Sequence, residues 1–590
     1  MPSGKALTFK TYPKGTSNMT GPSLAFSDKL HAEKYRAKGE TFRESQLRVA
    51  SALADNKEHF DALRDILLDQ RFLPAGRIQA AIGSTKAITP YNCYVSGTIS
   101  DSYIEGAGSI MARAREAAAT MRQGGGIGYD FSTLRPRGAL IKKLSSRSGG
   151  PLPFMEIFDA VCRATSSSGH RRGAQMGVLR IDHPDIEEFI RAKQNTHSLT
   201  GFNISVAVTD KFMEAVQAGA DFPLQFQGEI YRSVDARTLW NTLMRSTYDW
   251  AEPGVLFIDT INDRNNLYYC ESITATNPCG EQPLPPYGAC LLGSFNLVKY
   301  LSRPERFGPY VINWEQFYSD IPHVVRAMDN VIDKAKYPLH EQEEEAKMKR
   351  RMGLGLTGVA NALEAMGAPY GSTYFIELLR IIMGNMRDTA YRASIDLARE
   401  KGAFPLYRRD AYTSGRFVST LSEGVQEYLY RHGIRNSHLL SIAPTGTISL
   451  CADNVSSGIE PVFAHNTRRT LIEFDGPVVY DLVDYGVAFL STRGRTTEEV
   501  SVKQHLDVLT VAATHVDSAV SKTCNVPTDI DWDQFKNLYM DAWEAGCKGC
   551  TTYRKGGKRE AVLVDVDSAP PAIDGTSCEV DPVTGIRSCE

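Results

Sequence analysis

A short segment near the middle of the chain brings together three side chains that could do chemistry. Asn277, Cys279 and Glu281 alternate within NPCGEQPL (277–284), and the two prolines of this segment exclude a regular helix. In an extended segment, residues i, i+2 and i+4 point to the same side. We therefore expect an amide, a thiol and a carboxylate to converge there, although a proline-rich turn without chemistry has the same spacing.

The eleven cysteines admit three kinds of role: buried core thiols, metal ligands and redox chemistry. They are Cys93, Cys162, Cys270, Cys279, Cys290, Cys451, Cys524, Cys547, Cys550, Cys578 and Cys589. An odd number in a long chain without a secretion signal argues against a framework of structural disulfides. Cys162 and Cys451 stand among apolar residues, as core thiols do. Cys547 and Cys550 form a C-x₂-C pair, which could bind zinc if Cys578 and Cys589 completed a set of four sulfurs.

Further segments occur in an order typical of one enzyme family. They are YNCYV (91–95), GGGIGYD (124–130), LRPRG (134–138), GHRRGAQM (169–176), GACLLGSFNL (288–297), SIAPTGTI (441–448) and AGCKGCTTYR (545–554). Together with NPCGEQPL, they make the chain resemble the catalytic chains of ribonucleotide reductases, and in particular the class II, adenosylcobalamin-dependent form. The resemblance covers roughly residues 70–560, and the ordered set is far more specific than any single motif.

The resemblance implies a radical reaction on the ribose. Cys279 would carry a thiyl radical that takes the 3′ hydrogen, Glu281 would accept the proton of the 3′-OH, and Asn277 would hold the sugar hydroxyls in register. Cys93 and Cys290 would supply the protons and the two electrons that replace the 2′-OH. Each turnover would then leave a Cys93–Cys290 disulfide.

The same resemblance gives the two last cysteines a role. Cys578 and Cys589 would reduce the buried disulfide and pass the oxidation to a thioredoxin-like reductant. Thiol–disulfide exchange needs access and a thiolate, and a tail rich in Gly, Ser and Pro offers access. The alternative interpretation is that both are merely exposed thiols.

Phosphate binding is expected at two loops that carry little charge. By resemblance, Pro444, Thr445, Gly446 and Thr447 would hold the substrate's phosphates. Hydroxyls and backbone N–H groups at a helix N-terminus bind anions without net positive charge. Gly125 and Gly126 would allow close approach of the backbone. Their run is not a dinucleotide-binding fingerprint, because it follows a helix and ends in a tyrosine.

Specificity effectors, which are deoxynucleotides or ATP, are expected at a separate group of loop residues. By resemblance, these are Asp101, Ser148, Gly149, Arg171 and Arg172. The neutral alternative for the two arginines is a solvated charge cluster in a loop rich in Gly and Ser.

Two expected absences bear on regulation and on the radical source. Cys93 comes too early in the chain to follow an ATP-sensing cone domain, so we expect specificity control without an overall activity switch. The stretch around Tyr553 has one tyrosine where class I chains have an adjacent pair, and there is no glycyl-radical motif near the end. Adenosylcobalamin is therefore the expected cofactor. The alternatives are a class I-type catalytic subunit that needs a radical-generating partner, a nucleotide-binding regulatory protein that has lost catalysis, and a zinc-binding structural protein.

The chain must supply a large α/β framework to position these residues. It has 590 residues, 23% of them charged, and a net charge of −3, which excludes extensive disorder and a basic nucleic-acid surface. No apolar run is long enough to span a membrane, and we expect a cytoplasmic homodimer. Helices are predicted near 109–123, 153–166, 236–250, 314–334, 372–400, 501–521 and 531–545.

The resemblance implies a ten-stranded α/β barrel with a central finger loop that carries Cys279. The expected division is an N-terminal arm and helical region at 1–90, the catalytic barrel at 91–562 and a flexible tail with redox cysteines at 563–590. Whether the substrates are ribonucleoside diphosphates or triphosphates is left open.

Overall fold

The computed structural model describes residues 21–166, 174–194, 198–303, 308–473, 476–554 and 557–558. Its largest sheet has eight strands in the order β13-β2-β3-β6-β7-β10-β21-β20. Their bounds are β13 Ala289–Cys290, β2 Cys93–Val95, β3 Gly126–Asp130, β6 Gln175–Arg180, β7 Phe202–Val208, β10 Gly254–Phe257, β21 Gly549–Arg554 and β20 Thr523–Val526. The run from β2 to β10 is parallel, and β13 and β21 pair antiparallel to its two ends.

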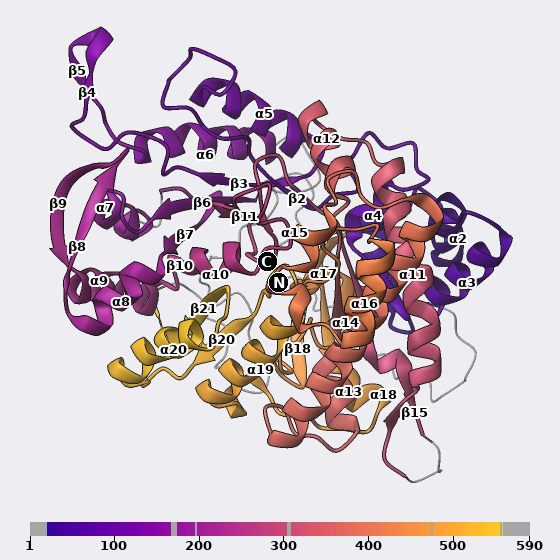
Figure 1. Cartoon of the computed structure of the whole chain (residues 1–590). Helices are drawn as coiled ribbons and strands as arrows, with labels where there is room; N and C mark the ends of the chain where they lie inside the picture. The colour runs from indigo at the N-terminus through magenta and orange to yellow at the C-terminus, as the bar shows by residue number, and fades with distance from the viewer. Residues whose placement is uncertain are drawn as a thin grey trace, which may run out of the picture.

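Helices make the crossovers that parallel strands require. They include α5 (Ile110–Arg122) between β2 and β3, α6 (Leu152–Ser166) between β3 and β6, and α9 (Ala236–Trp250) before β10. Figure 1 shows α5 and α6 together on one side of the molecule, above strands β3 and β6. Phe158 of α6 is fully buried and packs against Tyr129 of β3 with ring centroids 4.8 Å apart. The crossover helices therefore cover one face of this sheet with apolar side chains.

A second sheet of three strands has the order β1-β14-β17. It consists of β1 (Phe72–Pro74), β14 (Leu292–Asn296) and β17 (Gly353–Thr357). Only Leu291 separates β13 from β14, so this residue joins the two sheets. Single parallel bridges, Leu354↔Leu440 and Ile442↔Val520, also connect β17 with residues leading into β20. The sheets are thus linked on two sides, and a closed ten-stranded barrel stays a prediction.

Two glycines, Gly126 and Gly128, leave part of one face of β3 without side chains, and the candidate loop passes over that part. Gly126 and Gly128 alternate with Ile127 and Tyr129, and both larger residues are buried on the side of α5 and α6. A Cβ on Gly128 would lie 1.8 Å from the carbonyl oxygen of Thr276. Because side chains alternate along a strand, the glycines clear space for the loop on the opposite face.

Long helices cover the rest of the framework. They are α11 (Trp314–Lys334), α14 (Thr373–Lys401), α19 (Val502–His515) and α20 (Trp532–Glu544). The N-terminal helices are α1 (Ala25–Tyr35), α2 (Phe42–Leu53) and α3 (Lys57–Leu68). Figure 1 shows α2 and α3 beside α11 at one end of the molecule, with α8 (Asp210–Ala218) and α9 at the other. The first part of the predicted N-terminal helical region therefore contains three separate helices between Ala25 and Leu68.

Most predicted helices are confirmed to within about two residues, but the one predicted near 501–521 is too long. α19 ends at His515, and the residues beyond it pair with the segment 438–442. Ser518 N donates to Leu440 O at 3.1 Å, and Ser521 N donates to Ile442 O at 2.8 Å. This pairing between segments overrides the local helical pattern.

Within the described residues, no helix combines the length and the apolar character needed to cross a bilayer. The N-terminal arm is described from residue 21 onward. The amides of Ser23 and Leu24 donate to the carboxylate of Asp453 at 2.8–2.9 Å, so this part of the arm is attached to the body of the protein.

Candidate active site

The segment 277–284 forms a tight loop between two very short strands. β11 (Ala275–Thr276) pairs antiparallel with β12 (Pro283–Leu284). Asn277 closes the loop, because its Oδ1 accepts from Gln282 N at 2.9 Å and its own N–H donates to Gln282 O at 3.1 Å. Side-chain amides commonly stabilise turns in this way. The segment therefore turns between its two strands and is not extended throughout.

The three reactive side chains of the loop differ in exposure. Asn277 and Glu281 are 0% and 2% exposed, whereas Cys279 at the tip is exposed. A Cβ on the neighbouring Gly280 would meet no atom within 4 Å. The thiol therefore stands at the open side of the loop, and the amide and carboxyl lie beneath it.

The carboxyl of Glu281 is poised to gain or lose a proton near neutral pH. Burial raises the pKa of its carboxyl to about 7, and the neighbouring Asn277 side chain offsets part of that rise. Within the described part of the chain, Glu281 Oε2 and Asn277 Nδ2 are buried without a hydrogen-bond partner. Such atoms can bind a polar ligand, and a carboxyl with this pKa can accept a proton from it.

Cys93 and Cys290 face each other across the antiparallel pair of β2 and β13. Opposed Cα atoms in such pairs lie about 4.5–5.5 Å apart, which suits a disulfide. Burial raises the pKa of the Cys290 thiol well above its ordinary value, and charges on Cys93, Glu281 and Cys279 would add to that rise. The fold thus gathers two sequence-distant cysteines beside the candidate loop.

Two residues of the sheet, Gly126 and Asn203, set the place of the loop, and the second was not among the predicted site residues. A Cβ on Gly126 would lie 3.1 Å from the Pro278 ring and 3.3 Å from Cys93 Sγ, so Gly126 separates the loop from the cysteine. Asn203 of β7 donates from Nδ2 to Pro278 O at 3.0 Å. Its signal in the sequence was a polar residue within the apolar strand FNISVAV.

The second predicted loop leads into a short helix, α17 (Gly446–Cys451). Thr445 precedes it with φ +55°, and its hydroxyl is occupied within the protein. That oxygen lies 3.0 Å from Thr357 Oγ1 and accepts from Gly458 N at 2.7 Å. Pro444 and Gly446 are exposed and Thr447 is half-buried. The groups that face outward are therefore those of residues 444, 446 and 447, whereas the Thr445 side chain shapes the turn.

The predicted effector residues do not join the candidate loop. Asp101 is paired with Arg135, whose Nε lies 2.7 Å from its carboxylate. Ser148 is buried, and its Oγ accepts from Gly150 N at 3.0 Å, next to Gly149. The other two candidates, Arg171 and Arg172, lie outside the described residues.

Six of the remaining cysteines were considered in the sequence analysis for a core, metal-binding or redox role. Cys162 and Cys451 are 1% and 2% exposed, which confirms their prediction as core thiols. Cys547 and Cys550 are also buried, while the tail residues Cys578 and Cys589 lie outside the described residues. Among the residues that are described, no three His, Cys, Asp or Glu side chains gather as metal ligands would.

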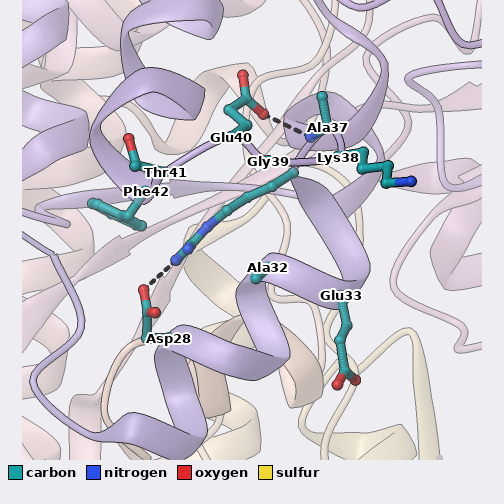
Figure 2. Close-up of a pocket in the computed structure, with 10 residues that line it drawn as sticks. Asp28, Ala32, Glu33, Ala37, Lys38, Gly39, Glu40, Thr41 and Phe42 are labelled. Atoms are coloured by element: carbon teal, nitrogen blue, oxygen red, sulfur yellow. Dashed lines mark hydrogen bonds and ion pairs between the residues drawn. The ribbon is translucent and has the colours of Figure 1, made fainter. Parts of the chain in front are cut away.

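A surface hollow lies away from these residues, in the N-terminal helical region. Figure 2 shows its lining, which comes from α1, the start of α2 and the turn between them. The Asp28 carboxylate pairs with Arg36 there, and Glu40 accepts from Ala37 N at 2.8 Å. Because Asp28, Arg36 and Glu40 of its lining already have partners in the protein, this hollow does not compete with the loop as the candidate active site.

Comparisons with known proteins agree with this geometry. The family model "Ribonucleotide reductase, barrel domain" matches residues 92–553. A vitamin B12-dependent ribonucleoside-diphosphate reductase of Mycobacterium tuberculosis is 35% identical over 512 residues, which are 82% of this chain and 69% of that protein. A protein of the same name from Thermoplasma acidophilum is 32% identical over 77% of this chain and 60% of its own length.

A vitamin B12-dependent ribonucleotide reductase of Streptomyces coelicolor is 28% identical over 76% of this chain and 55% of its own length. The matched region of the family model contains the loop 277–284 and both cysteines of the β2–β13 pair. On the extent of that match and the identity to the mycobacterial protein, the chain belongs to the ribonucleotide reductase family.

Proposed function

We propose that the chain is a vitamin B12-dependent ribonucleotide reductase, which converts ribonucleotides to 2′-deoxyribonucleotides for DNA synthesis. The observation that carries this proposal is the pairing of Cys93 with Cys290 beside the loop that bears Cys279 and Glu281. A dithiol close to a third thiol and a carboxyl provides the groups needed to remove a hydroxyl and to deliver two electrons. The vitamin B12 dependence in the names of the relatives supports the choice of cofactor.

In the proposed reaction, the loop acts on the 3′ position of the ribose. Cys279, as a thiyl radical, takes the 3′ hydrogen atom and returns it at the end of the cycle. Glu281 accepts the proton of the 3′-OH, and the orphaned Nδ2 of Asn277 holds the sugar oxygens. Fixing the sugar beside these groups supplies much of the rate enhancement, because orientation is established before the reaction begins.

The buried dithiol acts on the 2′ position. Cys93 protonates the departing 2′-OH, and Cys93 and Cys290 together give up two electrons as they form a disulfide. Water leaves, and carbon 2′ is reduced. The proposed place of Cys93 next to the substrate is supported by Gly126, because a Cβ there would contact both Cys93 Sγ and Pro278 of the loop.

The exposure of Cys279 fits a bulky cofactor. Its thiol stands on the open side of the loop, next to the unobstructed Gly280, so a large group can approach the sulfur without entering the buried site. Bound adenosylcobalamin would supply the radical through breakage of its cobalt–carbon bond. Cys279 is the residue of this chain that would face it.

We also propose that the linked sheets form a ten-stranded barrel around the loop. Eight strands would come from the larger sheet, with β14 continuing β13, and two more from β17 and the segment 438–442. The parallel bridges at Leu354 and Ile442 support this arrangement. The barrel would occupy residues 91–562, between the N-terminal helical region and the tail.

Further proposals concern binding partners. Gly125, Gly126, Pro444, Gly446 and Thr447 would contact the substrate, with Thr445 shaping the turn. Specificity effectors would bind near Asp101, Ser148 and Gly149, together with Arg171 and Arg172. We propose a homodimer that works in the cytoplasm with a thioredoxin-like reductant.

The decisive experiment is turnover by the purified chain with adenosylcobalamin and a small dithiol. We expect deoxynucleotide formation that depends on the cofactor, is lost in Cys279→Ser, and reveals whether diphosphates or triphosphates are reduced. The alternative, a class I-type catalytic subunit, predicts no product until a radical-generating partner is added. Inactivity of the wild-type chain under all cobalamin conditions would reject the proposal.

A further inference from the structure

Residues 517–519 connect the catalytic loop with the segment that leads to the predicted phosphate-binding turn. The N–H of Ala519 donates to the carbonyl oxygen of Glu281 at 2.9 Å. On its other side, the carbonyl of Ala519 accepts from Ile442 N at 3.1 Å. A displacement of this short segment would therefore move the backbone of Glu281 relative to the rest of the site.

Asp517 fixes residues 517–519 to the neighbouring segment 438–442. Its carboxylate accepts from the backbone N–H groups of Leu439 and Leu440, each at 2.8 Å, and from the hydroxyl of Tyr391 at 2.8 Å. The residue is 1% exposed. Burial raises the pKa of this carboxyl, whereas its three donors favour the ionised form. In that form charge-assisted hydrogen bonds hold it more strongly than neutral ones would.

The segment 438–442, to which Asp517 is hydrogen-bonded, is itself well supported. Leu354 N donates to Leu439 O at 2.7 Å, Met352 N donates to His438 O at 3.0 Å, and Ser441 N returns a bond to Leu354 O at 3.0 Å. The segment 438–442 is therefore fixed to β17 without any help from Asp517. We conclude that the segment 438–442 is the fixed partner and that residues 517–519 are positioned by it.

Lys548 holds the same segment from the opposite side. Its Nζ donates to the carbonyl oxygens of Asp517 and Ser518, each at 2.6 Å. The side chain is buried, which lowers the pKa of its ammonium to about 7, and the charge of Asp517 offsets part of that lowering. Because the Lys548 side chain donates to two adjacent peptide carbonyls, it restrains the backbone of residues 517 and 518 directly.

We propose that Asp517 and Lys548 are positioning residues for catalysis. Together they fix the 517–519 segment and, through the hydrogen bond from Ala519 N, the position of the Glu281 backbone in the site. The proposal rests on the base role given to Glu281 above. It assigns a function to the lysine of the sequence CKGC (547–550), whose two cysteines are the other polar groups of that motif.

The test compares Asp517→Asn, Lys548→Met and the double variant. Asparagine has nearly the same shape, but its NH₂ group would face a backbone N–H in place of an acceptor. Methionine keeps most of the lysine stem and removes the ammonium. We expect each single variant to lower kcat on the order of 100-fold, with KM changing far less, since small misplacements of catalytic groups have effects of this size. The double variant should lose little more, because both residues act on one segment.

Asp484→Asn is the matched control. Asp484 is another buried carboxylate that accepts a backbone N–H, from Gly486 at 2.8 Å, but it caps α18 (Tyr485–Phe489). It should lower thermal stability without a selective loss of kcat. If the Asp484 variant loses kcat as much as the Asp517 variant, or if both target variants change KM alone, the positioning role is wrong.

Amide hydrogen exchange tests the same idea without relying on turnover. Peptides covering 277–284 should exchange faster in the Asp517 and Lys548 variants than in wild type, and at the wild-type rate in the Asp484 variant. Unchanged exchange in both target variants would overturn the proposal even if the wild type were inactive. Should Asp517→Asn fail to fold, Tyr391→Phe removes one donor to that carboxylate and should give a smaller effect in the same direction.

Discussion

Glu281 sets the expected pH dependence of the reaction. Burial raises the pKa of its carboxyl to about 7, and a general base must be ionised to accept a proton. We therefore expect kcat/KM to rise with pH through a midpoint near 7 and to level off above it. Glu281→Gln should lower kcat by about 100- to 10,000-fold, the usual range for a general base, and should remove this limb from the residual rate.

A second buried carboxyl provides the control for that profile. Burial also raises the pKa of Glu364 to about 7, but this residue accepts from Tyr370 N and Arg495 N, away from the loop. Glu364→Gln should leave the midpoint of the pH profile unchanged. A rising limb that persists in the Glu281 variant, or that disappears in the Glu364 variant, would assign the titration to another group.

At the scale of single residues, the sequence could suggest candidate reactive groups but not their surroundings. The alternation of Asn277, Cys279 and Glu281 was visible in the motif, whereas the exposure of the thiol and the burial of its neighbours depend on a turn closed by Gln282. Thr445 shows the same limit. Its part in phosphate binding stays a prediction, but its hydroxyl also accepts from Gly458 N, a partner that only tertiary structure brings near.

At the scale of elements, the glycines of β3 are required because the loop lies too close for a side chain. Gly126→Ala would place a methyl group 3.1 Å from both the Pro278 ring and the carbonyl of Ala174, and 3.3 Å from Cys93 Sγ. Since backbone carbonyls yield little, the loop and the cysteine must move apart. We expect kcat to fall on the order of 10- to 100-fold because the reacting groups are displaced, as measured by steady-state turnover with a small dithiol.

Gly384→Ala is the counterpart of that substitution in α14. The nearest atoms to a Cβ there, on His515, lie at an ordinary 3.8 Å. Alanine within a helix should raise stability by up to about 1 kcal/mol, with turnover unchanged. If Gly126→Ala kept full activity, the close approach of β3 to the loop would be irrelevant to the reaction.

The elements differ in how far the sequence could predict them. Long amphipathic helices such as α11 and α14 follow from a repeating pattern of apolar residues. The strands that build the site, β2 and β13, have three and two residues, too few for any period to emerge. The end of α19 was missed for a related reason, because residues 516–521 follow a helical pattern locally but pair with 438–442 in the fold.

At the scale of the whole molecule, the proposed redox pair is enclosed. Cys290 is 0% and Cys93 is 8% exposed, and the fold brings them together from distant parts of the sequence through β2 and β13. A small dithiol can diffuse into such a site, but a protein reductant presents its thiol on a broad surface and cannot. Reduction by a thioredoxin-like protein therefore requires a carrier, and the tail cysteines are the proposed one.

This enclosure leads to a prediction that separates the two reductants. Cys578→Ser and Cys589→Ser should stop turnover driven by thioredoxin and should spare turnover driven by dithiothreitol, because only the carrier is lost. Mass spectrometry of the thioredoxin reaction should find the Cys93–Cys290 disulfide accumulating in both variants. Cys270→Ser, which alters an exposed cysteine outside the loop, should behave as wild type with either reductant. Equal loss under both reductants would show that the tail cysteines support the site in another way, because a pure carrier becomes dispensable once a small thiol reaches the disulfide directly.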